Sequence, residues 1–190
     1  MPKALYLDGA IEKIAALSPW RSWDVERSLI EGTRRILGAS RAHLIENVDI
    51  VGAHLYCGPA TEMVGYGAER LFVSGADRRA IIEKANLITT FSGSHFFGCC
   101  LLDDFPIALI SENDAENISV VTKSYSHEEG YRRLVGLTNS PLVRNAHVKK
   151  LTLYTDPARS AFREARYRIL RSRLRDKFAG IPVAAGPGVY

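Results

Sequence analysis

Hydrophobic residues between positions 91 and 124 fall into three short runs, separated by connectors rich in acidic residues and asparagine. The runs cover residues 95–102, 106–111 and 117–123. Connectors of two to five residues suit hairpin turns better than crossover helices. The pattern therefore predicts an antiparallel meander that forms the middle of a sheet.

Toward the N-terminus, apolar residues recur at helical spacing. They predict a short amphipathic helix over residues 4–17 and a second helix from Ser22 or Asp24 to about residue 37. Gly38 follows where a glycine commonly ends a helix.

Segments rich in Val, Ile, Leu and Tyr predict strands at residues 42–46 and 48–57. A glycine-rich loop then extends from Cys57 to Gly75 and contains a short predicted strand at 70–74. Asp77 can cap a helix that reaches about Asn86 and buries its isoleucines.

The last third of the chain gives the clearest helix signals. Ser126 can cap a helix with acidic residues in its first turn and arginines near its end. A strand is predicted at 147–155, followed by Asp156-Pro157 as the start of a terminal helix that ends near Phe178. Residues 181–190 are expected to form a mobile tail.

These elements predict an α+β fold: a mostly antiparallel central sheet of about six strands with helices on its faces. A chain of 190 residues suits one domain, which we place at 1–180 with the terminal helix 157–178 included. No run approaches the roughly 20 apolar residues that span a bilayer. Three cysteines do not make a disulfide framework, and the acidic residues near the N-terminus argue against a signal peptide. We expect a cytoplasmic protein that does not associate with membranes.

Residues 24–46 carry a resemblance to a known family. A helix ending in Ile36-Leu37-Gly38 leads through Ala39-Ser40-Arg41-Ala42 into a strand, which resembles the opening of a GAF-type sensory domain. The LuxR-type autoinducer-binding domain is a related sandwich. As a pattern of elements the resemblance covers residues 24–155. It implies a small-molecule-binding regulatory domain that signals as a dimer through its terminal helices.

The glycine-rich loop and the predicted sheet offer aromatic and apolar side chains for such a ligand. Neither of the common glycine-rich phosphate-binding spacings is present, so a nucleotide fingerprint is rejected. Packing in an ordinary core is the alternative for each of these residues. The predicted ligand-binding residues are Tyr56, Met63, Tyr66, Phe72, Phe96 and Phe97.

Histidines and cysteines supply a second group of candidates. His54 and Cys57 lie in one predicted strand, and His95, Cys99 and Cys100 lie in another. These side chains can hold zinc or haem, or form the nucleophile and base of a small enzyme. Cysteine is also among the most buried residue types, which favours core packing. The sequence identifies neither a cofactor nor a metal ligand set.

The terminal helix combines many arginines with an apolar stripe. The stripe consists of Ala158, Phe162, Ala165 and Ile169, continued by Leu170, Leu174 and Phe178. A solvated face, a homodimer contact and a polyanion-binding surface all fit this pattern. The charge of +4 lies mostly at the C-terminus, so nucleic-acid binding by the main body is not favoured.

Overall fold

The computed structural model describes residues 12–31, 38–66, 80–111, 115–120, 125–158 and 160–180. It divides into two compact units, residues 1–38 and 39–190. In the first unit, α1 (Trp23–Glu31) confirms the described part of the predicted second helix. Residues 12–17 are not helical, and the rest of the predicted first helix lies outside the described residues.

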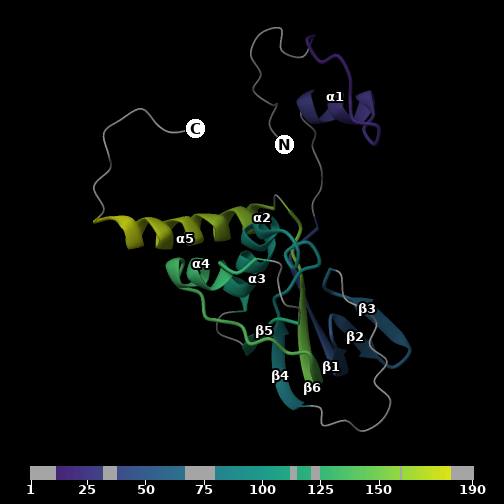
Figure 1. Ribbon diagram of the computed structural model, residues 1–190, viewed down its shortest axis with the longest axis vertical. Helices are drawn as coiled ribbons and strands as arrows, with labels where there is room; N and C mark the ends of the chain where they lie inside the picture. The colour runs from purple at the N-terminus through teal and green to yellow at the C-terminus, as the bar shows by residue number, and fades with distance from the viewer. Residues whose placement is uncertain are drawn as a thin grey trace. The chain divides into compact units, whose positions relative to one another are not determined.

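The second unit contains a six-stranded sheet with the order β3-β2-β1-β6-β4-β5 (Figure 1). Strand β6 is antiparallel to β1 and parallel to β4. The α+β class and the six strands are confirmed, but the sheet is mixed and not mostly antiparallel. The strands are β1 (Arg41–Val51), β2 (His54–Cys57), β3 (Ala60–Met63), β4 (Ala80–Leu87), β5 (Glu116–Ile118) and β6 (Asn145–Thr155).

Tight hairpins build the antiparallel half of the sheet. Strand β1 turns into β2 through Gly52, and β2 turns into β3 through Gly58. Both glycines have positive φ angles, 58° and 56°, which most other residues avoid. The predicted strand 48–57 is therefore two strands joined by a turn. The predicted strand at 70–74 lies outside the described residues.

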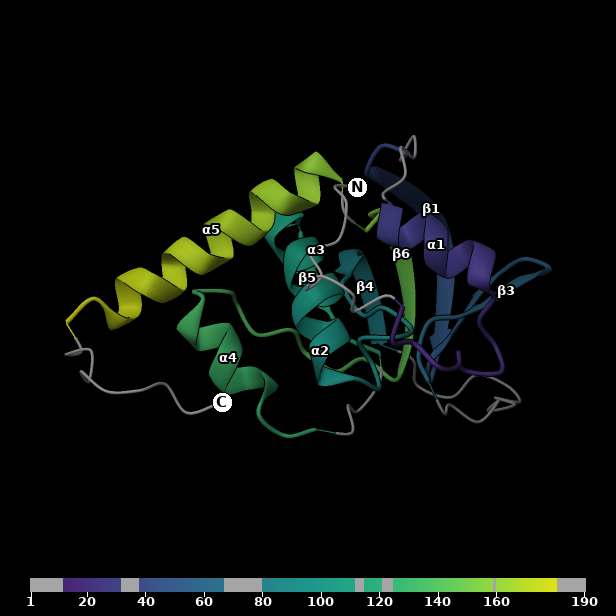
Figure 2. The ribbon, with the colours of Figure 1, turned by 90° about the horizontal axis from the view of Figure 1, so that it is seen from above.

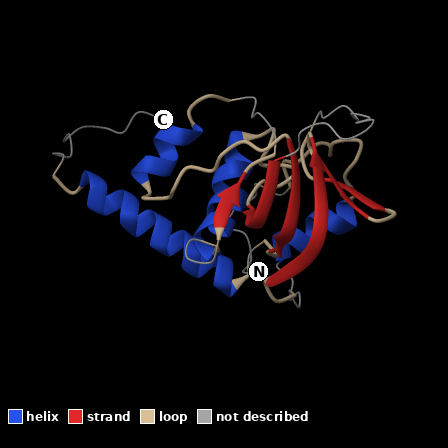
Figure 3. Ribbon diagram, turned by 90° about the horizontal axis from the view of Figure 1, so that it is seen from below, coloured by secondary structure: helices blue, strands red, loops and turns tan. Residues whose placement is uncertain are grey.

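The helices of this unit gather to one side of the sheet, next to β4 and β5 (Figures 2 and 3). The segment η1 is a π-helical turn between two short α-helices. The helical elements are α2 (Phe97–Cys99), η1 (Cys100–Asp104), α3 (Phe105–Ile110), α4 (Glu128–Leu134) and α5 (Ala161–Phe178).

The predicted meander is wrong, because residues 97–110 are helical throughout. Burial in this segment does not alternate as it would in a half-buried strand: Cys100, all five residues of 104–108 and Ser111 are buried. The helices connect β4 to β5, which are parallel. Parallel neighbours require a crossover connection, so a hairpin cannot join them. Of the three runs, only residues 117–123 contain a described strand, at β5.

The predicted helix at 77–86 is also wrong. Residues 80–87 form β4, which lies between β6 and β5. Ile81, expected in a helix core, is 70% exposed, whereas Ala85 and Leu87 are buried. A short apolar run of this kind does not by itself distinguish a strand from a buried helix.

Two clusters of buried side chains hold the unit together. One is formed mainly by the strands and includes Val48, Ile50, Val148 and Leu151. The other lies among α3, α4 and α5, around Phe105 and Leu170. The helices therefore have a core of their own, which fixes α5 against α3 and α4.

The C-terminal predictions hold best. Strand β6 and the end of α5 at Phe178 are confirmed. Helix α4 is confirmed as well, although His127 and not Ser126 precedes it. The cap of α5 is Ser160, whose Oγ accepts a hydrogen bond from the Arg163 amide at 3.1 Å. Asp156, the predicted cap, is buried in an ion-pair network instead. None of the described helices is long and apolar enough to cross a bilayer.

Candidate functional site

A groove of about 710 Å³ lies between α4 and the last turn of α5. Its volume is in the range of small-molecule sites. Helix α4 and the residues just before it supply most of the lining, and α5 contributes one cation. The lining residues are Ser126, His127, Glu129, Gly130, Tyr131, Arg133, Leu134 and Lys177.

Four aromatic rings cluster at this groove. Phe97, the first residue of α2, lies 4.1 Å from His127 and 4.9 Å from Tyr131 between ring centroids. Its ring also meets Tyr125 at 5.3 Å. All three contacts are edge-to-face, the arrangement that aromatic pairs prefer. Because His127 and Tyr131 line the groove, Phe97 supports the aromatic wall that a ligand would meet.

Tyr125 anchors this cluster to the loop that follows β4. Its hydroxyl donates a hydrogen bond to the Gly93 carbonyl at 2.5 Å. Burial, together with a hydrogen bond to Cys100, raises the pKa of Tyr125 well above its ordinary value. The phenol therefore stays protonated and acts as a structural donor.

The buried carboxylate of Asp104 holds the same loop through hydrogen bonds. Its Oδ1 accepts hydrogen bonds from Thr90 Oγ1 at 2.7 Å and from the Thr90 amide at 3.0 Å. The Gly93 amide in turn donates to Thr90 Oγ1 at 3.0 Å. A Cβ at Gly93 would lie 2.2 Å from Asp104 Oδ1, so only glycine fits there. The turn before α2 is thus rigidly placed.

A second aromatic group lies on the other side of this turn. Tyr66 stacks on His95 with centroids 4.1 Å apart, and His95 meets Phe96 edge-on at 4.5 Å. The Tyr66 amide donates to Ser94 Oγ at 2.7 Å, which ties residues 64–66 to the turn. Tyr66 and Phe96 are more than half exposed.

The structure thus separates the six predicted ligand residues. It brings Tyr66 and Phe96 together through His95, whereas the ring of Phe97 belongs to the groove cluster. Tyr56 and Met63 lie on β2 and β3. Phe72 lies outside the described residues, as does the rest of the glycine-rich loop from residue 67 to residue 75.

The groove residues missed from the sequence are those of α4 and the end of α5. Tyr125, His127 and Tyr131 form an aromatic sequence beside Arg133, and that composition was the available signal. Lys177 gave no local signal, because only the packing of α5 brings it to α4.

The cysteines and histidines occupy separate places. Cys100 is fully buried, Cys57 and Cys99 are half-buried, and none of these three described cysteines forms a disulfide. Cys57 donates to the Glu46 carbonyl at 3.6 Å. His54 is buried on β2, and its Nδ1 has no hydrogen-bond partner in the described chain. Among the described residues, no three His, Cys, Asp or Glu side chains are grouped to hold a metal ion.

A buried ion-pair network fixes the start of α5. Asp156 pairs with Arg163 Nε at 2.9 Å and with Arg166, and it accepts a hydrogen bond from Ser40. Arg163 also reaches Asp103 of η1 at 2.6 Å. Burial alone would raise the pKa of Asp156, but these hydrogen bonds and positive charges hold it below its ordinary value.

The predicted apolar stripe of α5 does not lie on one face. Leu170 and Leu174 pack into the helical core. Phe162 and Ile169 are 66% and 45% exposed, on another side of the helix. Helix α5 therefore has a packed side and an outer side.

No family model, no curated protein and no solved structure matches the chain. The assignment of a function therefore rests on the geometry of the site.

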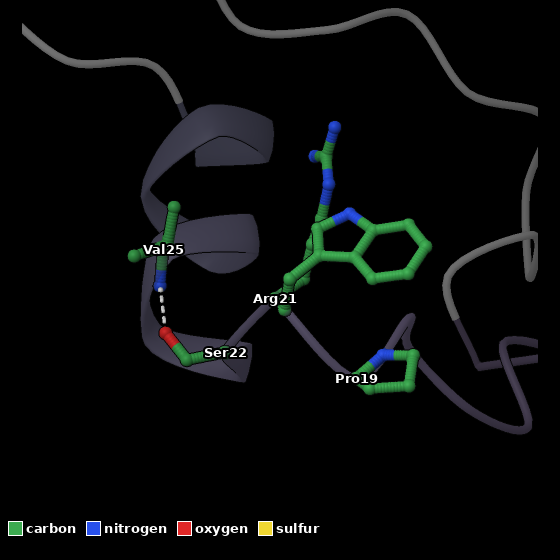
Figure 4. Close-up of a pocket in the computed structure, with 5 residues that line it drawn as sticks. Pro19, Arg21, Ser22 and Val25 are labelled. Carbon is green, nitrogen blue, oxygen red and sulfur yellow. Dashed lines mark hydrogen bonds between the residues drawn. The ribbon is translucent and has the colours of Figure 1, made fainter.

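The N-terminal unit has a smaller cavity of its own, about 420 Å³, at the start of α1. Figure 4 shows the hydrogen bond from the Val25 amide to Ser22 Oγ, 3.4 Å long, which caps the helix beside this cavity. Pro19 and Arg21 complete the wall together with an exposed Trp20. Among the described residues that line it, Arg21 alone is charged, so it offers less for recognition than the groove at α4.

Proposed function

We propose that this chain is a regulatory domain that binds a planar, negatively charged small molecule in the groove between α4 and α5. The observation that carries the proposal is the juxtaposition of aromatic rings and cations. His127 and Tyr131 offer stacking surfaces, while Arg133 and Lys177 line the same groove.

Each part of such a ligand has a partner. An aromatic ring stacks on or meets the edges of His127 and Tyr131, which Phe97 supports. A carboxylate, sulfonate or phosphate pairs with the guanidinium of Arg133 and the ammonium of Lys177. Glu129, the one acid among the described lining residues, disfavours ligands with excess negative charge near α4.

The position of Lys177 supports a regulatory role. It belongs to the last turn of α5, so a bound anion contacts both helices at once. The opposite end of α5 is tied to η1 through Arg163 and Asp103. Ligand binding can therefore change how firmly the C-terminal half of α5 is held. Dimerisation through α5, GAF-like ancestry and a cytoplasmic location remain predictions.

The fluorescent dye anilinonaphthalene sulfonate tests this proposal, because it is a planar aromatic anion. We expect saturable binding with one site per chain in fluorescence titrations. Arg133→Gln combined with Lys177→Gln should weaken binding by about tenfold, since each lost charge contact contributes up to about 1 kcal/mol.

The matched control is Arg168→Gln combined with Arg171→Gln, which removes the same charge from the outer side of α5. This variant should bind the dye as the wild type does. An equal loss of dye affinity in both variants would show that binding depends only on the net charge of the protein. Unchanged binding in the groove variant would reject the groove as the site. Loss after Phe96→Ser alone would move the site to the aromatic group around Tyr66.

A further inference from the structure

The excess positive charge of the chain resides in one helix. Helix α5 contains seven arginines and lysines and two acidic residues, a net charge of +5, whereas the whole chain carries +4. The remainder of the chain is therefore slightly acidic. An excess localised on one element is the electrostatic footprint expected of a polyanion-binding surface.

Three of these seven cations have partners in the body of the unit, and a fourth lines the groove. Arg163 and Arg166 pair with buried Asp156. Arg173 donates to the carbonyl of Gly136 at 3.3 Å, and Lys177 lines the groove. These side chains are explained by packing and by the proposed ligand site.

The other three cations, Arg168, Arg171 and Arg175, are exposed. Spacings of three and four residues place them as neighbours along the helix. Arg168 makes a loose pair with Glu164 at 3.6 Å, and both side chains remain well exposed. Within the described chain, no ion pair holds Arg171 or Arg175. Figures 1 and 2 show α3 and α4 on the same side of α5. Leu170 packs into the helical core and marks this side, and the three exposed arginines lie roughly 100° or more around the helix axis from it.

The distribution of apolar residues decides among the partners such a helix could bind. Phe162 and Ile169 are exposed, but charged residues are interspersed with them and no broad apolar face forms. Insertion into a membrane surface needs a helix with strongly segregated faces. Pairing with a second copy would bring like charges of Arg168 and Arg171 close together, which is unfavourable. Binding to a phosphate backbone needs no segregated apolar face and brings no like charges together.

We infer that Arg168, Arg171 and Arg175 form a surface that binds the phosphate backbone of double-stranded DNA. Over seven residues of helix these cations span about 10 Å, and the whole of α5 is about 27 Å long. The major groove of B-form DNA admits an α-helix, so the arginines can reach phosphates along its edge. The deep, narrow major groove of double-stranded RNA excludes a helix. This surface is distinct from the groove, and the inference does not rest on the ligand proposed there.

Fluorescence anisotropy with a labelled, mixed-sequence DNA duplex of about two helical turns tests the inference. The wild type should bind at low salt, with an affinity that falls steeply as salt is added. Arg168→Gln, Arg171→Gln and Arg175→Gln together should weaken binding more than tenfold at low salt. The slope of log affinity against log salt should fall by about 2 to 3, because each lost phosphate contact contributes about 0.9.

The matched control removes three positive charges from the sheet, by Lys84→Gln, Lys149→Gln and Lys150→Gln. It should keep most of the affinity and the slope, and circular dichroism should show that both variants are folded. Absence of duplex binding by the wild type would overturn the inference, as would equal loss in the control. Preference for double-stranded RNA or for phosphatidylserine vesicles would also overturn it. If the arginine variant instead converts a dimer to a monomer in analytical ultracentrifugation, the surface belongs to a second copy of the chain.

Discussion

Asp103 and Asp104 are consecutive residues whose carboxylates hold two different parts of the molecule. Asp103 Oδ1 accepts a hydrogen bond from Arg163 Nη1 of α5 at 2.6 Å. Asp104 Oδ1 accepts two from Thr90, in the loop after β4, at 2.7 and 3.0 Å. Both belong to the π-helical turn η1, a type of turn often found at functional sites. This turn links the segment that carries Phe97 to the helix that carries Lys177.

Removing these two carboxylates should have unequal effects. Asp104→Ala leaves the partly buried amide and hydroxyl of Thr90 without their acceptor and should lower the free energy of unfolding by about 2–3 kcal/mol. Asp103→Ala should cost about 1 kcal/mol, because its carboxylate is partly exposed and Arg163 keeps its pair with Asp156. Urea unfolding measures both. A larger cost for Asp103→Ala would contradict this assignment.

Two glycines of the same region form a matched pair. Gly93→Ala places a methyl group against the Asp104 carboxylate and should destabilise the protein by about 1–3 kcal/mol. Gly98 has open space where a Cβ would stand and lies in α2, so Gly98→Ala should stabilise by about 0.5–1 kcal/mol. Thermal unfolding of the two variants, followed by circular dichroism, checks the opposite signs.

The Asp156 network should make stability depend on pH. Because the folded-state pKa of Asp156 is lowered, its contribution is present above the unfolded-state pKa of about 3.9 and is lost as the pH falls through the folded value. Asp156→Asn should therefore be clearly less stable than the wild type at neutral pH. The difference should shrink below about pH 4. Glu164→Gln, at an exposed carboxylate of α5, serves as the control and should show only a small change at either pH.

The thiols should differ in reactivity. Cys100 is fully buried, whereas Cys57 and Cys99 are partly exposed. Under native conditions a disulfide reagent should modify Cys57 and Cys99 well before Cys100, and denaturant should abolish the difference. Mass spectrometry of peptides after timed labelling identifies each site. Rapid native labelling of Cys100 would show that the core around it opens readily.

If both proposals hold, the groove and the outer side of α5 should influence each other. An anion bound near Lys177 lowers the positive potential at neighbouring Arg175. Anilinonaphthalene sulfonate should therefore weaken DNA binding by about two- to fivefold, and DNA should weaken dye binding by the same factor. The combined Arg133→Gln and Lys177→Gln variant should abolish this coupling. Anisotropy titrations with and without dye measure it.

The sequence predicted those elements whose own residues specify them. The end of α5 and the strand β6 agree with the sequence, because the β-prone run at 147–155 and the glycine and proline that follow Phe178 each indicate the observed element. Residues 95–111 were misassigned because their acidic connectors are typical of hairpins. That this segment is a helical crossover becomes evident only when the parallel neighbour β5 is known.

The candidate site shows a similar division. Phe97 was expected to contact a ligand, and the structure places it behind the groove wall. Arg133 and Lys177 are far apart in the sequence and meet only because α4 packs beside α5. A site formed between two helices has no local sequence pattern that covers all of it. Only the aromatic residues around α4 gave a signal in the sequence.

The central place of β6 has a consequence for synthesis of the chain. Among the described strands β6 is the last to leave the ribosome, yet it joins the hairpins of β1–β3 to the parallel pair β4–β5. Arg41 finds its partner only when Thr155 has been translated. Until then the nascent chain exposes the unpaired edges of β1 and β4, and edges of this kind promote aggregation. A chaperone that covers these edges during translation would therefore raise the yield of folded protein without changing the stability of the folded state.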